Sequence, residues 1–328
     1  MNSWIRAFGI VSTVLAISAV LPQAVGAQAP PYITQWGALG TGDGQLQNPF
    51  GVATDASGNV YVADYYNHRI QKFTSAGAYL TQWGTLGSGD GQFNYPSGVA
   101  TDASGNVFVA EEVNHRIQKF TSTGTYVTQW GSFGSGNSQF STPELLATDA
   151  SGNVYVADLG NHRIQKFTNT GAYLTQWGSS GSGDGQFSYP SGVATDASGN
   201  VYVTDSGNNR IQKFTGGGAY LAQWGTAGVG NGELNFPEGV ATDAAGNVYV
   251  VDDGNHRMQM FSTTGTYLAQ WGALGSGNGE FNYPLGVATD SGGNVYVADQ
   301  FNHRIEKFGA VPTLAKPMSW GRLKSLYR

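Results

Sequence analysis

The stretch from Pro49 to Gly84, PFGVATDASGNVYVADYYNHRIQKFTSAGAYLTQWG, decides the fold, because it recurs down the chain with few changes. Its closing tryptophan sets the period. A spacing of 47 residues separates each member of one series from the next: Trp36, Trp83, Trp130, Trp177, Trp224 and Trp271. So constant a spacing indicates one structural unit copied in tandem.

Each unit is expected to form four short strands, because runs of β-branched and aromatic residues alternate with turn residues. In the first unit the strands are predicted at 51–54, 59–63, 69–73 and 79–83. Gly58 supplies the positive φ of a tight turn between the first two strands. A lone four-stranded meander cannot bury both of its faces, so the copies must stack. A period of 40–50 residues with four strands per copy predicts a β-propeller.

The two ends of the repeat region are incomplete in complementary ways. Tyr32–Gly37 matches the fourth strand of a unit, whereas the last unit stops at Phe308 after its third strand. Pairing them removes an exposed sheet edge. We therefore predict an all-β, six-bladed β-propeller of four-stranded antiparallel blades over residues 28–308, closed by the N-terminal strand.

The segments GVATD, GNVYVAD, NHRIQKF and YLTQWG resemble the NHL repeat family, and the resemblance covers roughly residues 32 to 308. It suggests a secreted, bacterial-type six-bladed propeller. It leaves the function open, since the family includes protein-binding and RNA-binding propellers and receptor sensor domains, and has lyases among its relatives.

Residues 1–27 are predicted to be a secretory signal peptide. Arg6 precedes an apolar run over residues 8–21, and Val25-Gly26-Ala27 is a small-residue cleavage signal. A permanent membrane anchor is the alternative, but the run is short for a span. We expect a protein secreted to the extracellular space or the periplasm, with no membrane span after cleavage. With no cysteine in the chain, its stability must come from core burial and ring closure.

Residues 309–328 depart from the repeat and carry Lys316, Arg322, Lys324 and Arg328 without an acidic side chain. This basic C-terminal tail is either a sorting or docking tag or a frayed or surface-packed end. The whole chain has a formal charge of −6 and only 12% charged residues. A nucleic-acid surface usually needs clustered lysine and arginine, so none is expected.

Several residues that suggest chemistry repeat too regularly to form one site. The histidines share one position in different units: His68, His115, His162, His256 and His303. Sixfold symmetry spreads them around a ring instead of gathering three on one ion. Glycine-rich segments such as 87–91 precede strands instead of the helix that a phosphate cradle needs, so they are interpreted as crossovers between blades. We predict neither a metal nor a cofactor.

The units differ most at two positions, which should lie at the same end of the sheet. The residue after the repeated proline is Phe50, Ser97, Glu144, Ser191, Glu238 or Leu285. Each unit also has an acidic residue at the end of its second strand, Asp64 in the first unit. The two residues after this repeated acid supply further candidates: Tyr65, Tyr66, Glu112, Asp253, Gln300 and Phe301. Variable residues on a rigid repeated frame commonly build a binding surface. The alternative is that exposed turn positions simply drift.

We expect Phe50, Tyr65, Tyr66 and Phe301 to form an aromatic patch at one mouth of the central channel. Glu112, Glu144, Glu238 and Asp253 should flank it with negative charge. The third unit also replaces the usual Gly-Val by Leu145-Leu146. That added side chain should narrow the channel or change the local turn.

The leading functional hypothesis is a non-catalytic, monomeric binding propeller that recognises a protein, peptide or glycan at this mouth. The alternative is a propeller enzyme, a lyase or lactonase with a metal at the central channel. A third possibility, ubiquitin ligation, is excluded because the family members with that activity carry cysteine-rich domains that this chain lacks.

Overall fold

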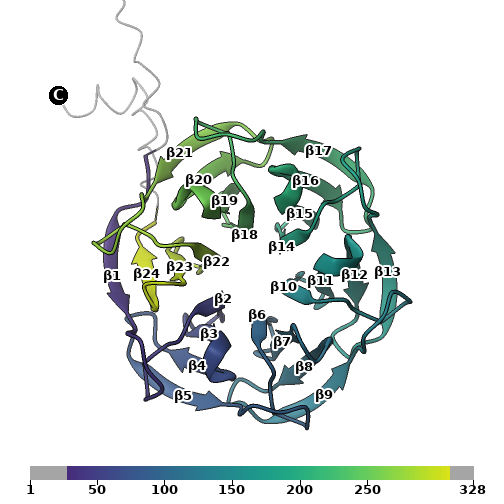
Figure 1. Ribbon diagram of the computed structural model, residues 1–328, viewed down its shortest axis with the longest axis vertical. Helices are drawn as coiled ribbons and strands as arrows, with labels where there is room; N and C mark the ends of the chain where they lie inside the picture. The colour runs from purple at the N-terminus through teal and green to yellow at the C-terminus, as the bar shows by residue number, and fades with distance from the viewer. Residues whose placement is uncertain (1–27, 311–328) are drawn as a thin grey trace, which may run out of the picture.

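The computed structural model describes residues 28–310, and these residues form a closed ring of six blades (Figure 1). Each blade is a sheet of four hydrogen-bonded strands. Viewed down the ring axis, the first strand of every blade lies at the centre and the last lies on the perimeter. The predicted all-β six-bladed propeller is therefore confirmed.

The strands fall into four concentric sets, taken here from blade one to blade six. The innermost strands are β2 (Pro49–Thr54), β6 (Pro96–Thr101), β10 (Pro143–Thr148), β14 (Pro190–Thr195), β18 (Pro237–Thr242) and β22 (Pro284–Thr289). The second strands are β3 (Val60–Asp64), β7 (Val107–Glu111), β11 (Val154–Asp158), β15 (Asn200–Asp205), β19 (Asn247–Asp252) and β23 (Val295–Asp299).

The third strands are β4 (Arg69–Phe73), β8 (Arg116–Phe120), β12 (Arg163–Phe167), β16 (Arg210–Thr215), β20 (Arg257–Ser262) and β24 (Arg304–Phe308). The outermost strands are β5 (Tyr79–Trp83), β9 (Tyr126–Trp130), β13 (Tyr173–Trp177), β17 (Tyr220–Trp224), β21 (Tyr267–Trp271) and β1 (Tyr32–Trp36). Short 3-10 turns join second to third strands in four blades: η1 (Tyr65–Asn67), η2 (Leu159–Asn161), η3 (Ser206–Asn208) and η4 (Asp253–Asn255).

The ring closes through the N-terminal strand, as predicted. Strand β1 pairs antiparallel with β24 and completes the sheet β1-β24-β23-β22. Tyr32 lies opposite Phe308, and Trp36 lies opposite Ile305. In Figure 1 the first strand accordingly lies on the perimeter beside the last.

The innermost strands begin earlier than predicted and contain a bulge at one end. Pro49 pairs with Asp64, but the next regular pair joins Val52 to Val62, so Phe50 and Gly51 lie in a register shift. Proline is tolerated because it is the first residue of the strand. The same bulge follows the proline in all six blades. Bulges reorient side chains and are common beside functional sites.

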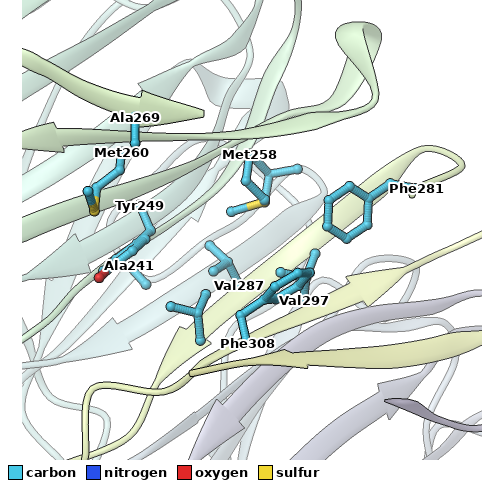
Figure 2. Packing of buried hydrophobic residues seen from close by; sticks show 11 residues of the cluster. Ala241, Tyr249, Met258, Met260, Ala269, Phe281, Val287, Val297 and Phe308 are labelled. Carbon is cyan, nitrogen blue, oxygen red and sulfur yellow. The ribbon is translucent and has the colours of Figure 1, made fainter. Parts of the chain in front are cut away.

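The hydrophobic core lies between neighbouring blades. Between blades five and six, Met258, Phe281 and Phe308 belong to one apolar cluster, in which Met260 lies beside Tyr249 (Figure 2). Burying each large side chain of this kind contributes about 1.5–3 kcal/mol. Equivalent clusters fill the other five blade interfaces. Because each interface needs both neighbours, the blades are stable only as a ring.

The repeated acid and arginine form a structural pair inside each blade. In blade one, Arg69 Nε lies 2.7 Å from Asp64 Oδ2, and both side chains are buried. The arginine also donates to the carbonyls of Thr41, Gly42 and Gln45. The glycine-rich segment is thus a crossover that folds around the guanidinium. Together with Asp64 and Gln82, its carbonyl oxygens accept hydrogen bonds from all of the N–H groups of Arg69.

The repeated histidines also have a structural role. In each case Nδ1 accepts a hydrogen bond from a backbone N–H of the next blade, as in His68 with Tyr95 N at 3.1 Å. In the fourth blade Asn209 Oδ1 takes the same bond from Phe236 N at 2.9 Å. The imidazoles therefore join neighbouring blades.

The signal peptide expected over 1–27 and nearly all of the basic tail expected over 309–328 lie outside the described residues. Within residues 28–310, no helix is long and apolar enough to cross a membrane.

Candidate binding site at the channel mouth

The structure brings both variable positions of every blade to the end of the channel where the innermost strands begin. The first residue of each innermost strand pairs with the repeated acid, as Pro143 does with Asp158. The residue after the proline and the pair after the acid are therefore neighbours. All twelve predicted site residues lie at this mouth, although they do not all face it in the same way.

An apolar plug forms the floor of the mouth. Phe50, Leu145 and Leu285 pack together although they come from blades one, three and six, and Tyr65 packs against them. Only blade three has a side chain at the position of Leu145. In blade two, a Cβ on Gly98 would lie 2.4 Å from Glu144 O, because neighbouring innermost strands approach backbone to backbone. The Leu145 side chain instead reaches Phe50 and Leu285 of blades one and six, and it therefore narrows the channel.

Carboxylates from blades two, three and five lie at the same mouth. Glu144 and Glu238 follow the prolines of blades three and five, and Asp253 opens η4. Glu144 Oε2 and Asp253 Oδ1 are buried and accept no hydrogen bond. Buried acceptors are normally satisfied, so an unpaired carboxylate oxygen calls for an explanation.

The environment of these acids favours their neutral forms. Burial, and then the charges of Glu238 and Glu112, raise the pKa of Glu144 well above its usual value. Burial raises the pKa of Glu238 to about 7. Burial, and then the charges of Glu238 and Asp252, raise the pKa of Asp253 to about 8. These three carboxyls therefore influence one another's charge.

Two hydrogen bonds join neighbouring blades across the mouth. The hydroxyl of Tyr65 donates to Glu112, and the hydroxyl of Ser191 donates to Glu238. Burial, and then the hydrogen bond to Glu112, raise the pKa of Tyr65. Ser97 is fully buried, as Ser191 is, but its hydroxyl lies 3.1 Å from the backbone carbonyl oxygens of Pro143 and Glu144 instead of reaching a carboxylate. Ser97 therefore belongs to the interface between blades.

The expected aromatic patch is divided into two groups. Phe50 pairs with Tyr65 at 5.6 Å between ring centroids, and Tyr65 pairs with Tyr66 at 5.2 Å. Phe301 instead meets Tyr283 edge-on at 5.3 Å. Tyr66 and Phe301 are exposed, whereas Phe50 is buried. Gln300 is partly buried beside Phe301.

Sequence reasoning missed a second set of mouth residues, those immediately before the repeated proline. All six have a positive φ, and four of them are aromatic: Tyr95, Tyr189, Phe236 and Tyr283, with φ between 48° and 56°. A left-handed backbone is unusual for a bulky residue. Here it recurs in every blade, where the N–H of the residue donates to the bridging histidine or asparagine. Tyr189, Phe236 and Tyr283 are exposed. A large aromatic residue directly before a repeated proline was the available signal.

Within residues 28–310, no three histidine, aspartate or glutamate side chains are grouped so that they could hold a metal ion. The mouth therefore offers three kinds of surface: an apolar floor, partly neutralised carboxylates and exposed aromatic rings.

These features define the chain as a six-bladed β-propeller with a closed ring and a differentiated channel mouth. The family model for the NHL repeat matches residues 46–73, 93–120, 140–167, 187–214, 234–261 and 281–308. The chain belongs to the NHL repeat family.

Similar solved structures include proteins of several kinds. A gluconolactonase from Xanthomonas campestris is 16% identical, with a TM-score of 0.62 over 87% of this chain and 96% of that one. Virginiamycin B lyase from Staphylococcus aureus is 16% identical, with a TM-score of 0.56 over 81% and 96%. A nidogen/laminin complex contains a chain that is 18% identical, with a TM-score of 0.53 over 69% and 81%. At this identity the likeness shows the fold alone. No curated protein sequence matches the chain.

Proposed function

We propose that this chain is an exported, non-catalytic binding propeller whose ligand, a protein, peptide or glycan, docks at the channel mouth. Export rests on the predicted signal peptide over residues 1–27. Binding at the mouth rests on the contrast between the conserved frame of the blades and their divergent turn residues.

One observation carries the proposal. The frame uses the same acid–arginine pair and the same inter-blade hydrogen bonds six times over, yet the mouth places unpaired carboxylate oxygens beside a plug of apolar side chains. The unpaired oxygens are costly, since unpaired buried acceptors destabilise a fold, whereas the plug itself is already buried. A bound partner with hydrogen-bond donors offsets this cost.

A specific observation also favours an enzyme as the second candidate. Glu144 and Glu238 lie at the same channel mouth and have raised pKa values, as expected for groups that act as general acid or base near neutral pH. A gluconolactonase and a lyase share the fold. Under this alternative, Glu238 shuttles the proton and a ligand is recovered chemically changed.

The proposal is tested by probing peptide and glycan arrays with protein that begins at Gln28, beside two variants. The mouth variant combines Tyr66→Ala with Phe301→Ala, both exposed and therefore removable without emptying the core. The control combines Ser57→Ala with Ser104→Ala, on turns at the opposite end of the ring. Binding should be lost in the mouth variant and kept in the control, and mass spectrometry should recover the ligand unchanged. Binding that is lost only in the control places the site at the other end, and a modified ligand favours the enzyme.

A further inference from the structure

Four acidic side chains at the mouth have no arginine or lysine partner in the described part of the chain. Glu112, Glu144, Glu238 and Asp253 come from three different blades. The charges of Glu238 and Glu112 raise the pKa of Glu144, and the charge of Glu238 raises the pKa of Asp253. Burial alone does not explain why two of their oxygens lack any donor. A serine hydroxyl reaches Glu238, so donors can be built at this place in the fold, yet Glu144 Oε2 and Asp253 Oδ1 have none.

Within residues 28–310, every arginine and lysine is engaged elsewhere. The six arginines pair with the repeated acids inside their own blades. Each of the five lysines donates to a turn carbonyl of a neighbouring blade, as Lys72 Nζ does to Ser122 O at 3.1 Å. These turns lie at the opposite end of the strands, so no cation in this part of the chain neutralises the mouth.

The surroundings of the carboxylates restrict the shape of a ligand. The plug of Phe50, Leu145 and Leu285 lies next to Glu144, which directly precedes Leu145 in β10. A ligand that reaches the acids must therefore lie along an apolar wall, with the Tyr65 ring against the same cluster. An aliphatic stem with a positive end matches this arrangement, because long basic side chains bury their methylene groups and keep a charged tip. Aromatic faces add further attraction for a cation.

We infer that the mouth recognises a positively charged side chain, the ammonium of a lysine or the guanidinium of an arginine presented by a peptide or protein partner. This inference rests on the proposed function, since it names the ligand class of the same site. The cation supplies N–H donors to Glu144 Oε2 and Asp253 Oδ1, and its stem covers Leu145 and Phe50. Charge-assisted hydrogen bonds of this kind are about twice as strong as neutral ones.

The test uses two capped pentapeptides with four glycines around a central lysine or a central norleucine, which differ only in the ammonium group. Titration calorimetry at pH 8 should show the lysine peptide binding about tenfold tighter or more, as expected for hydrogen bonds to charged groups. The triple variant Glu144→Gln, Glu238→Gln and Asp253→Asn removes the charges of all three buried acids and should abolish this preference. Its melting temperature should not fall, since glutamine and asparagine have the shapes of the protonated acids.

Glu233→Gln is the matched control. It removes one negative charge from a crossover loop, where four other blades already have glutamine in the same hydrogen bond, as Gln45 shows. This variant should keep the full preference for lysine. Equal binding of the two peptides to the wild-type chain overturns the inference. So does Ca²⁺ binding that depends on the same glutamates without any preference for lysine.

The two proposals fail in different ways. If a glycan or the norleucine peptide binds and is lost with Tyr66→Ala and Phe301→Ala, the inferred cation is wrong and the mouth remains a binding site. If ligands from the arrays bind but are insensitive to every mouth variant, the proposed function itself is wrong.

Discussion

Arg304 Nη1 donates a 2.6 Å hydrogen bond to Gln35 Oε1, although the two residues are 269 positions apart. In blade one the same bond joins Arg69 to Gln82 at 2.6 Å, only 13 positions apart. The N-terminal strand therefore reproduces the local chemistry of an ordinary fourth strand. The ring is therefore closed by the same hydrogen bond that joins the third and fourth strands within the other blades.

Trp36 should contribute strongly to closure. Its ring packs against Phe73 of blade one and Tyr296 of blade six, with centroid distances of 5.9 and 6.1 Å. We expect Trp36→Ala to lower the free energy of unfolding by about 3 kcal/mol or more, within the range for large aromatic truncations. Ile33→Ala, on the exposed face of the same strand, should cost far less. Denaturant unfolding of both variants checks this. Equal losses would mean that β1 does not depend on its tryptophan.

Glu306 should make the protein less stable as pH rises. It replaces the glutamine of the other five blades, is fully buried, and has an unpaired Oε2. Burial raises its pKa to about 7 from the ordinary glutamate value of 4.5, despite the opposing charge of Arg304. The folded state therefore holds a proton that the unfolded state has released, so stability falls as pH rises from about 4.5 to 7.

Glu306→Gln should remove this loss. At pH 8 the variant should be more stable by about 3 kcal/mol at most, from 1.36 kcal/mol per pKa unit, and at pH 4 the two proteins should match. The glutamine in blade one shows why it fits, since Gln71 Nε2 donates to both Gln45 O and Asp64 Oδ2. Thermal melts at both pH values test the prediction. A variant with no gain at pH 8 would show that Glu306 is ionised without cost.

The histidines that bridge neighbouring blades should have the opposite effect and make the protein less stable as pH falls. Burial lowers the pKa of His68, His115, His256 and His303 below 6.5, against the nearby acidic charges. Protonation removes the acceptor that each Nδ1 offers to the next blade. The stability they supply is present above pH 6.5 and is lost as pH falls through the lowered folded-state pKa.

The variant His256→Asn should reduce this acid sensitivity, because Asn209 makes the same bond in blade four. The measurement is the free energy of unfolding between pH 7 and pH 5. Identical slopes for wild type and variant would mean that the imidazole does not titrate in this range.

Binding of a cationic peptide should strengthen as pH rises from 6 to 9. Burial raises the pKa of Glu238 to about 7 and the pKa of Asp253 to about 8. The groups that face Glu238 are Ser191, Glu144 and Asp253. Ionisation of Glu238 or Asp253 increases attraction for a cation, so protons are released on binding at the lower end of this range. Calorimetry in buffers of different ionisation enthalpy measures that release. An affinity that is constant across this range would exclude these acids from the contact.

Much of the architecture follows from the sequence, because a fixed spacing and two complementary half-units leave few ways to close the ring. The position of the mouth also follows, since hairpin geometry brings both variable positions to one end. The details of the site do not. A pre-proline residue usually favours extended backbone, so the left-handed Tyr95 and Tyr283 were not foreseen. Nor does the sequence show that Ser97 is buried or that Phe301 turns toward Tyr283, because both depend on packing between blades.

The most direct test of the central claim is a crystal structure of the chain, from Gln28 onward, with a ligand selected by the arrays. The account predicts ligand density above Leu145, within hydrogen-bond distance of Glu144 and against Tyr65. Density at the opposite end of the ring, over the Asp55 to Gly58 turns, with the mouth unchanged from the free protein, would contradict it.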